Sequence, residues 1–253
     1  MAPRFDDVYP AYVSVAEKRK RATAEIARRK KAGDPCEPVL PIEGREIATT
    51  FWGKGWCERF ESFRDFESRL PRGRSYARNG SVIDLRVRAG AVEARVMGSD
   101  PEPYEITVTV KPLAAARWKT LASATAGKIS SLVGLLSGEL SPDVLEVLTK
   151  RDGGLYPEPG DLTFACSCPD WAKLCKHVAA SLYGIGARLD TRPELLFTLR
   201  GVDEKELISS AARATTKAAR ATSGKKLLDD RKLGAIFGIE LATRIPPAKR
   251  RRR

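Results

Sequence analysis

Histidine is almost absent from this sequence, and long apolar runs are absent altogether. The 253 residues include one histidine and five cysteines. No stretch approaches the roughly 20 consecutive apolar residues that a membrane-spanning helix needs, and the amino-terminal residues lack the apolar core of a signal peptide. The sequence therefore predicts a cytoplasmic protein, with association with the nucleoid left open. Thiols stay reduced in that compartment, so clustered cysteines are more typical of metal ligands than of disulfides.

Motifs of the common enzyme classes are also missing. The sequence has no Walker loop for phosphates, no nucleophile elbow and no pair of carboxylates in a recognisable catalytic motif. Its single histidine falls among the cysteines, where it is better placed to bind a metal than to transfer protons. We therefore predict a protein that is not an enzyme, with no catalytic residues and no small-molecule substrate.

Three of the cysteines and the only histidine lie close together, as Cys166, Cys168, Cys175 and His177. Residues two apart on a strand share a face, so Cys166 and Cys168 would present both sulfurs to one side. The turn at Pro169 would then bring the chain back to Cys175 and His177, where the next helix begins. Three thiolates and one imidazole close the four-coordinate shell of structural zinc and leave no position for a catalytic water. We predict one structural Zn²⁺ ion.

Other interpretations of these cysteines are weaker. A cysteine can be a small buried apolar residue, but four ligand residues in two i,i+2 pairs are not explained by that role. A redox pair usually has the spacing Cys-x-x-Cys rather than Cys-x-Cys. The remaining Cys36 and Cys57 are interpreted as structural or incidental.

A helix is predicted directly after the histidine. Its apolar stripe, at steps of four, three and four residues, is Val178, Leu182, Ile185 and Leu189. This stripe is expected to pack on Phe164 and Trp171. Lys173 and Lys176 lie beside the thiolates in sequence and would favour their deprotonated form.

Three segments before the cysteines alternate apolar and polar residues, in the runs SVIDLRV, AVEARVM and YEITVTV. This period of two predicts a three-stranded antiparallel β meander with one buried face and one polar face rich in arginine. Helical patterns at 113–150, with a start signal at Ser141 and Pro142, are expected to cover the apolar face. The fold class is therefore α+β.

Aromatic residues concentrate on one expected helix near residue 50, where Trp56, Phe60 and Phe63 share a face. We interpret them as core anchors; a platform for stacking bases would usually have flanking basic residues, which this helix lacks. Before it, residues 12–33 form a basic helix or arm, and 34–46 resemble a linker.

The formal net charge is +13. Such an excess favours a polyanionic partner, although a plain basic protein with solvated tails would have it too. A loop with four arginines, expected to contact nucleic acid, carries Arg69, Arg72, Arg74 and Arg78. The basic tail could meet an anionic membrane surface, but no strongly amphipathic helix accompanies it, so no membrane partner is predicted.

The stretch CSCPDWAKLCKH resembles a SWIM-type zinc finger, and its four ligand positions match Cys166, Cys168, Cys175 and His177 without substitution. A broader resemblance to bacterial SWIM zinc-finger proteins spans roughly 49–207, through FWGKGWCERFE, LPRGRSYARNGSVIDLRV and LLFTLRGVD. The resemblance implies a small ββα zinc module that binds DNA or proteins. Bacterial members are often linked with helicases of the chromatin-remodelling type, and the finger itself has no assigned enzymatic activity.

Together these patterns predict four segments: a basic helix and linker at 1–48, an α+β domain with the three-stranded sheet at 49–150, a SWIM-type zinc finger with its following helix at 151–210, and a basic tail at 211–253. The predicted function is that of a zinc-binding, non-enzymatic protein that binds nucleic acid, with DNA favoured, as part of a larger complex. The alternative is a protein-interaction adaptor, for example for a helicase-like partner.

Overall fold

The computed structural model describes residues 13–63, 69–126, 128–129 and 132–207. Contacts divide the chain into two compact units, Met1–Ala211 and Ala212–Arg253. The second unit, and with it the predicted basic tail, lies outside the described residues. No helix in the described part of the chain combines the length and apolar character needed to cross a bilayer.

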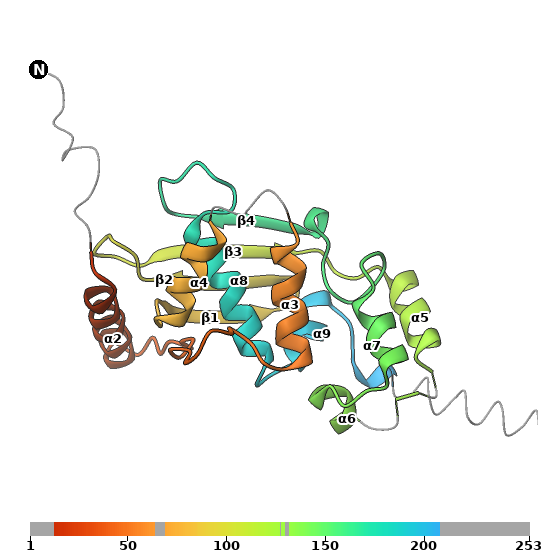
Figure 1. Ribbon diagram of the computed structural model, residues 1–253. Helices are drawn as coiled ribbons and strands as arrows, with labels where there is room; N and C mark the ends of the chain where they lie inside the picture. The colour runs from red at the N-terminus through yellow and green to blue at the C-terminus, as the bar shows by residue number, and fades with distance from the viewer. Residues whose placement is uncertain (1–12, 64–68, 127, 130–131, 208–253) are drawn as a thin grey trace, which may run out of the picture. The chain divides into compact units, whose positions relative to one another are not determined.

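One antiparallel sheet forms the centre of the first unit, with its strands in the order β1-β2-β3-β4 (Figure 1). The strands are β1 (Val82–Arg88), β2 (Ala91–Val96), β3 (Tyr104–Val110) and β4 (Leu162–Cys166). The α+β class and the antiparallel meander are thus confirmed. The prediction of three strands is wrong, because β4 pairs with β3 from Leu162 opposite Val110 to Cys166 opposite Ile106. The first cysteine therefore ends an edge strand of the main sheet.

The alternation of side chains along β2 and β3 agrees with the prediction. In β3, Tyr104, Ile106, Val108 and Val110 are buried, whereas the residues between them are exposed. In β1 the pattern breaks, since Ile83 and Asp84 are buried as well as their neighbours. Ile83 faces the helix α2 (Val15–Lys31), where it packs with Ala22. The basic amino-terminal segment is therefore a helix that contacts the sheet.

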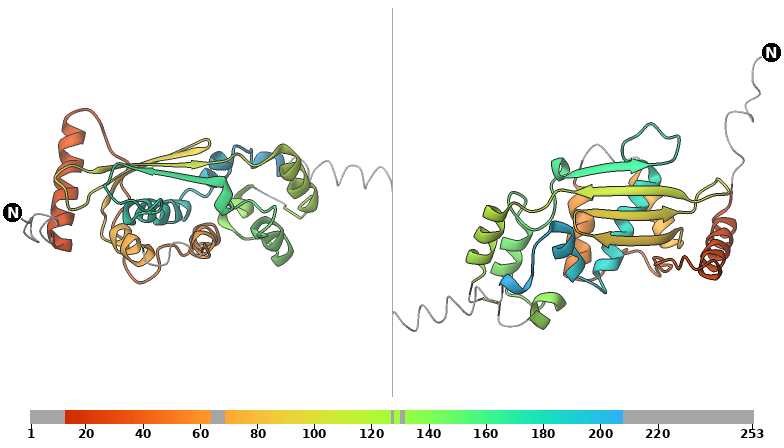
Figure 2. Two further views of the ribbon diagram at one scale, coloured as in Figure 1. Left: turned by 90° about the horizontal axis from the view of Figure 1, so that it is seen from above. Right: turned by 180° about the vertical axis from the view of Figure 1, so that it is seen from behind.

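Helix α8 (Lys176–Leu189) covers the buried face of the sheet, and α3 (Phe51–Glu61) and α4 (Leu70–Arg78) pack on α8 from the other side (Figure 2). Eleven of the fourteen residues of α8 are buried, as a helix between two layers requires. The predicted stripe Val178, Leu182, Ile185 and Leu189 is buried throughout.

Helices α5 (Ala115–Ala124), α6 (Leu132–Ser137) and α7 (Pro142–Thr149) lie beyond one end of the sheet (Figure 1). The expectation that they cover its apolar face is wrong. Each is short and buries only a few residues, whereas α8 is longer and apolar on nearly every side. Packing on the sheet therefore buries more apolar surface with α8 than with these helices. The helix that follows α8, α9 (Glu194–Arg200), packs against β1.

The aromatic residues of α3 are core anchors, as predicted. Trp52, Trp56 and Phe60 are at most 2% exposed. The Trp56 indole N–H donates to the Leu182 carbonyl at 2.9 Å, so its polar atom is satisfied inside the core. Each of these side chains packs in the main hydrophobic core and so attaches α3 to it.

The arginine-rich segment, predicted as a loop, is the helix α4. Pro71 lies in its first turn, where a missing N–H costs nothing. Leu70, Gly73 and Ala77 are buried at helical spacing. A Cβ at Gly73 would overlap the Ala179 methyl group and lie 2.9 Å from the Ala179 carbonyl carbon, so α4 and α8 approach within the space that only glycine leaves. Proline and glycine therefore do not end this helix. Pro71 is accommodated in its first turn, and Gly73 lets it pack closely on α8.

Candidate metal centre

The four predicted ligands come from three consecutive pieces of the chain. Cys166 is the last residue of β4, and Cys168 lies in the loop that follows. Cys175 is the N-cap of α8, and His177 is in the first turn of that helix. Their ligand atoms, one per residue, all lie within 4.8 Å of one another. The structure therefore brings together all four residues that the spacing predicted.

The distances suit a single ion between the ligands. Cys166 Sγ lies 3.9 Å and Cys175 Sγ 4.0 Å from His177 Nδ1. A tetrahedral zinc ion would separate a sulfur and a nitrogen ligand by about 3.5 Å, so only small side-chain movements separate this arrangement from a closed shell. Cys175 and His177 are at most 1% exposed, which keeps water from the inner side of the site.

Two tyrosines and a glycine hold the imidazole in place. The Tyr104 ring stacks on His177 with centroids 4.0 Å apart, and the Tyr76 ring meets it edge-on at 5.6 Å. A Cβ at Gly98 would lie 3.2 Å from His177 Nε2, so this position has little room for a side chain. His177 Nε2 is buried without a hydrogen-bond partner in the described part of the chain. The ring therefore presents Nδ1 to the three sulfurs.

The electrostatics of the cluster favour a bound cation. Hydrogen bonding from the Cys166 thiol holds the pKa of Cys175 well below its usual range, and His177 acts in the same direction. The hydrogen bond to Cys175, together with burial, raises the pKa of Cys166 well above its usual range. Burial lowers the pKa of His177, so its imidazole is neutral at pH 7. Without a cation the sulfurs cannot all be anionic at this spacing, whereas a divalent ion would compensate all three.

The other two cysteines stand apart from this cluster. Cys57 is buried in α3, where burial raises its pKa to about 12, and Cys36 is partly exposed. Among the described residues, no second group of three or more His, Cys, Asp or Glu side chains is arranged to hold a metal ion.

The loop between the ligand pairs is fastened to α4. Arg69 Nη2 lies 3.3 Å from Asp170 Oδ1, and the same carboxylate oxygen accepts the Ala172 N–H at 3.2 Å. Phe164 packs partly buried against the core, as predicted. Trp171 does not pack on the stripe of α8: it is 90% exposed. It lies in the loop between Cys168 and Cys175, outside both β4 and α8.

The four arginines predicted to contact nucleic acid all lie on or next to α4, but in different settings. Arg69 pairs with Asp170, and Arg74 pairs with Glu61 while its guanidinium lies 5.1 Å from the centre of the Tyr183 ring. Arg78 is partly buried, and Arg72 is exposed. They therefore do not form one open basic surface, and of the four only Arg72 is an exposed residue.

The predicted arginine-rich face of the sheet is largely neutralised. Arg95 lies 3.2 Å from both Asp34 and Asp84, and Arg86 lies 3.2 Å from Asp84. Arg88 pairs across the strands with Glu93 at 3.5 Å. This face is polar, as predicted, but much of its positive charge is paired with acids.

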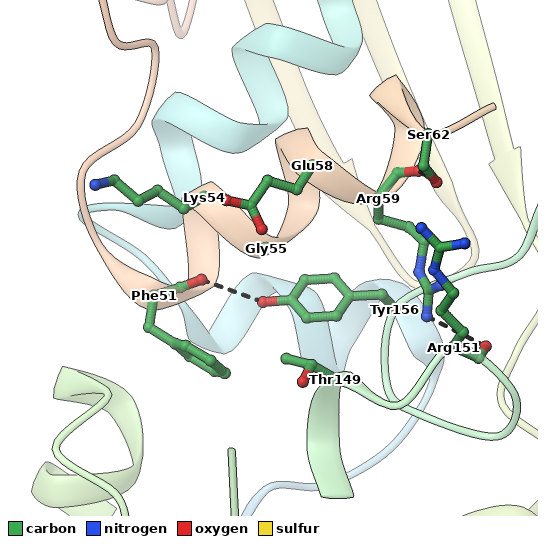
Figure 3. Close-up of a pocket in the computed structure, with 9 residues that line it drawn as sticks. All are labelled: Phe51, Lys54, Gly55, Glu58, Arg59, Ser62, Thr149, Arg151 and Tyr156. Atoms are coloured by element: carbon green, nitrogen blue, oxygen red, sulfur yellow. Dashed lines mark hydrogen bonds between the residues drawn. The ribbon is translucent and has the colours of Figure 1, made fainter. Parts of the chain in front are cut away.

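A cavity of about 440 Å³ lies away from the metal ligands, between α3 and the segment around residues 149–156 (Figure 3). Its Tyr156 hydroxyl donates to the Trp52 carbonyl at 3.1 Å. Arg59 donates to the carbonyls of Lys150 and Arg151 at 3.1 and 3.2 Å. These two side chains therefore find hydrogen-bond partners within the protein.

Fold and site together define an α+β protein with a Cys₃His cluster that can hold one metal ion. The chain is 35% identical over 189 residues to the protein named "Uncharacterized protein Rv2102" of Mycobacterium tuberculosis, a match that covers 71% of this chain and 68% of the relative. It therefore belongs to the family of that mycobacterial protein. No family model matches the chain, and no solved structure matches it. The name of the relative states no activity, so a function for this chain has to be inferred from the site.

Proposed function

We propose that this chain is a zinc-binding protein of the SWIM type, without enzymatic activity, that binds nucleic acid, DNA in particular, as part of a larger complex. The observation that carries the zinc proposal is the convergence of Cys166, Cys168, Cys175 and His177 within 4.8 Å. The positive charge of the chain and the exposed groups beside that cluster carry the proposal of nucleic acid.

Zinc is the ion that this ligand set suits best. Thiolates and imidazole are the soft and borderline ligands that zinc prefers, whereas magnesium and calcium require oxygen ligands. Three cysteines and a histidine fill a tetrahedral shell, so the ion would have no open position for a reacting water. Its role would be to join the end of β4 to the start of α8.

Nucleic acid is favoured by the charge around the loop at 169–174, called the metal loop, which connects Cys168 to Cys175. Lys173 and Arg72 are exposed, and Lys176 is partly exposed. The ion pair of Arg69 with Asp170 and the close contact of Gly73 with Ala179 place the start of α4 beside the start of α8. Lys173 lies in the metal loop, Lys176 follows Cys175 and Arg72 lies in the first turn of α4, and none of the three forms an ion pair with another described residue. These charges add to a net charge of +13.

Binding should depend steeply on salt. Each phosphate contact by lysine or arginine releases counterions, so four contacts would weaken binding to duplex DNA on the order of 100-fold between 50 and 200 mM salt. Replacing Arg72 with alanine should reduce the slope of log affinity against log salt by about 1. Fluorescence anisotropy with a labelled duplex at several salt concentrations measures both quantities.

Arg88→Ala is the matched control, because Arg88 carries the same charge on the sheet and pairs with Glu93. It should leave the slope unchanged. A protein that binds neither DNA nor RNA at 50 mM salt would contradict the proposal. That result would favour the adaptor alternative, in which the metal loop docks on a protein partner such as a helicase.

A further inference from the structure

Trp171 differs from every other tryptophan of the chain in its exposure. The chain has four tryptophans, and Trp52, Trp56 and Trp118 are at most 5% exposed. Trp171 is 90% exposed. An indole is the largest apolar side chain, so leaving it in water forgoes a stabilisation that the other three obtain by burial. Folding of the described unit therefore does not account for a tryptophan at this position.

The loop that carries Trp171 is held at both ends. Cys168 precedes it and Cys175 follows it, and both belong to the metal cluster. The preceding Asp170 is fastened to Arg69 and to the Ala172 amide. The ring is therefore displayed on an anchored loop, which lowers the entropic cost of stacking against a partner.

Cationic residues lie close to Trp171 in the sequence and on the neighbouring helix α4. Lys173 is exposed two residues away, Lys176 follows Cys175, and Arg72 extends from the adjacent first turn of α4. The nearest carboxylate in sequence, that of Asp170, is compensated by Arg69. An exposed aromatic ring with exposed cations nearby is the combination by which proteins bind single strands, where bases stack and phosphates meet positive charge. A docking site for a protein would not require this charge.

We propose that the metal loop binds single-stranded nucleic acid, with the Trp171 indole stacked on one unpaired base and Lys173, Lys176 and Arg72 contacting the flanking phosphates. This inference rests on the proposed nucleic-acid function and narrows it, because a base in a duplex does not offer its face to the indole. The contact is tolerant of sequence, since every base has a face on which a ring can stack.

Tryptophan fluorescence tests the inference directly, because the three other indoles are shielded in the core. Titration of the full chain with a 12-nucleotide oligothymidylate, its ribonucleotide counterpart and a 12-base-pair duplex should quench the exposed component with either single strand only. Trp171→Ala should weaken single-strand binding by roughly fivefold to a hundredfold, the range expected for one stacked base. Trp171→Phe should bind within a few-fold of the wild type but show no quenching.

The outcomes separate this inference from the proposed function. Single-strand affinity that is equal in the wild type and Trp171→Ala, with no quenching, overturns the stacking role and leaves nucleic-acid binding intact. Failure of the wild type to bind any of the three oligomers overturns both. Circular dichroism of Trp171→Ala should match the wild type, because the removed side chain is almost entirely in solvent.

Discussion

Removal of the metal is expected to destabilise the whole described unit, not only the loop that carries the ligands. Helix α8 begins at the metal cluster and contacts all four strands as well as α3 and α4. An ion present at a thousand times its dissociation constant contributes about 4 kcal/mol to stability, and structural zinc in small fingers contributes about 10–16 kcal/mol of binding free energy. We expect a loss of at least about 4 kcal/mol and a clearly lower Tm after chelation.

Thermal unfolding followed by circular dichroism, with and without a strong chelator, measures this loss. Limited proteolysis should then cut the metal-free chain between Cys168 and Cys175. Cys168→Ser should reproduce the effect, whereas Cys36→Ser, outside the cluster, should not. Identical transitions and identical cleavage before and after metal removal would mean that the site does not stabilise the fold.

The second large effect is expected from Trp56→Ala, which should cost about 4 kcal/mol of unfolding free energy. Trp56 is 2% exposed, and its indole N–H bonds to the Leu182 carbonyl, so its removal leaves a cavity between α3 and α8. Urea denaturation of the variant measures the change. Trp171→Ala is the matched control: it deletes the same side chain at 90% exposure and should change stability by less than about 0.5 kcal/mol.

Metal removal and the Trp56→Ala substitution test two different attachments of helix α8 to the rest of the unit. A bound metal ion would hold the first turn of α8, whereas Trp56 bonds at Leu182, nearer the middle of the helix. If Trp56→Ala were no more destabilising than Trp171→Ala, α3 would not be part of the core as described.

The ligand set could be predicted from sequence because its geometry is local. Cys166 and Cys168 are two residues apart at the end of a strand, and Cys175 and His177 are two residues apart at the start of a helix. Such spacings determine which way side chains point without knowledge of the rest of the fold. The alternation in β3 and the aromatic face of α3 were predictable for the same reason.

Long-range pairing could not be predicted in this way. Nothing in the sequence of β4 indicates that it pairs with β3, some fifty residues earlier, and so becomes the fourth strand of the sheet. Likewise, α5, α6 and α7 have apolar residues, but which helix covers the sheet is decided by competition with α8. The division of residues 49–210 into a domain and a finger stays a prediction, although β4 and the sheet share one set of hydrogen bonds.

The charge that remains available on the folded surface was the feature predicted least well from the sequence. The sequence predicts a face of the sheet rich in arginine, but Arg86 and Arg95 pair with Asp34 and Asp84 once the chain folds. Conversely, Arg72 gains importance because α4 lies beside the metal loop. Ion pairs between segments that are distant in sequence decide which charged side chains remain available to a ligand. The net charge of the sequence does not reveal these pairs.

X-ray absorption spectroscopy of the purified chain, combined with metal analysis, tests the central claim most directly. We predict one zinc ion per chain, with three sulfur ligands at about 2.3 Å and one nitrogen ligand at about 2.0 Å. A folded chain that contains no metal, or a metal shell without sulfur, would contradict the assignment of Cys166, Cys168, Cys175 and His177 as a zinc site.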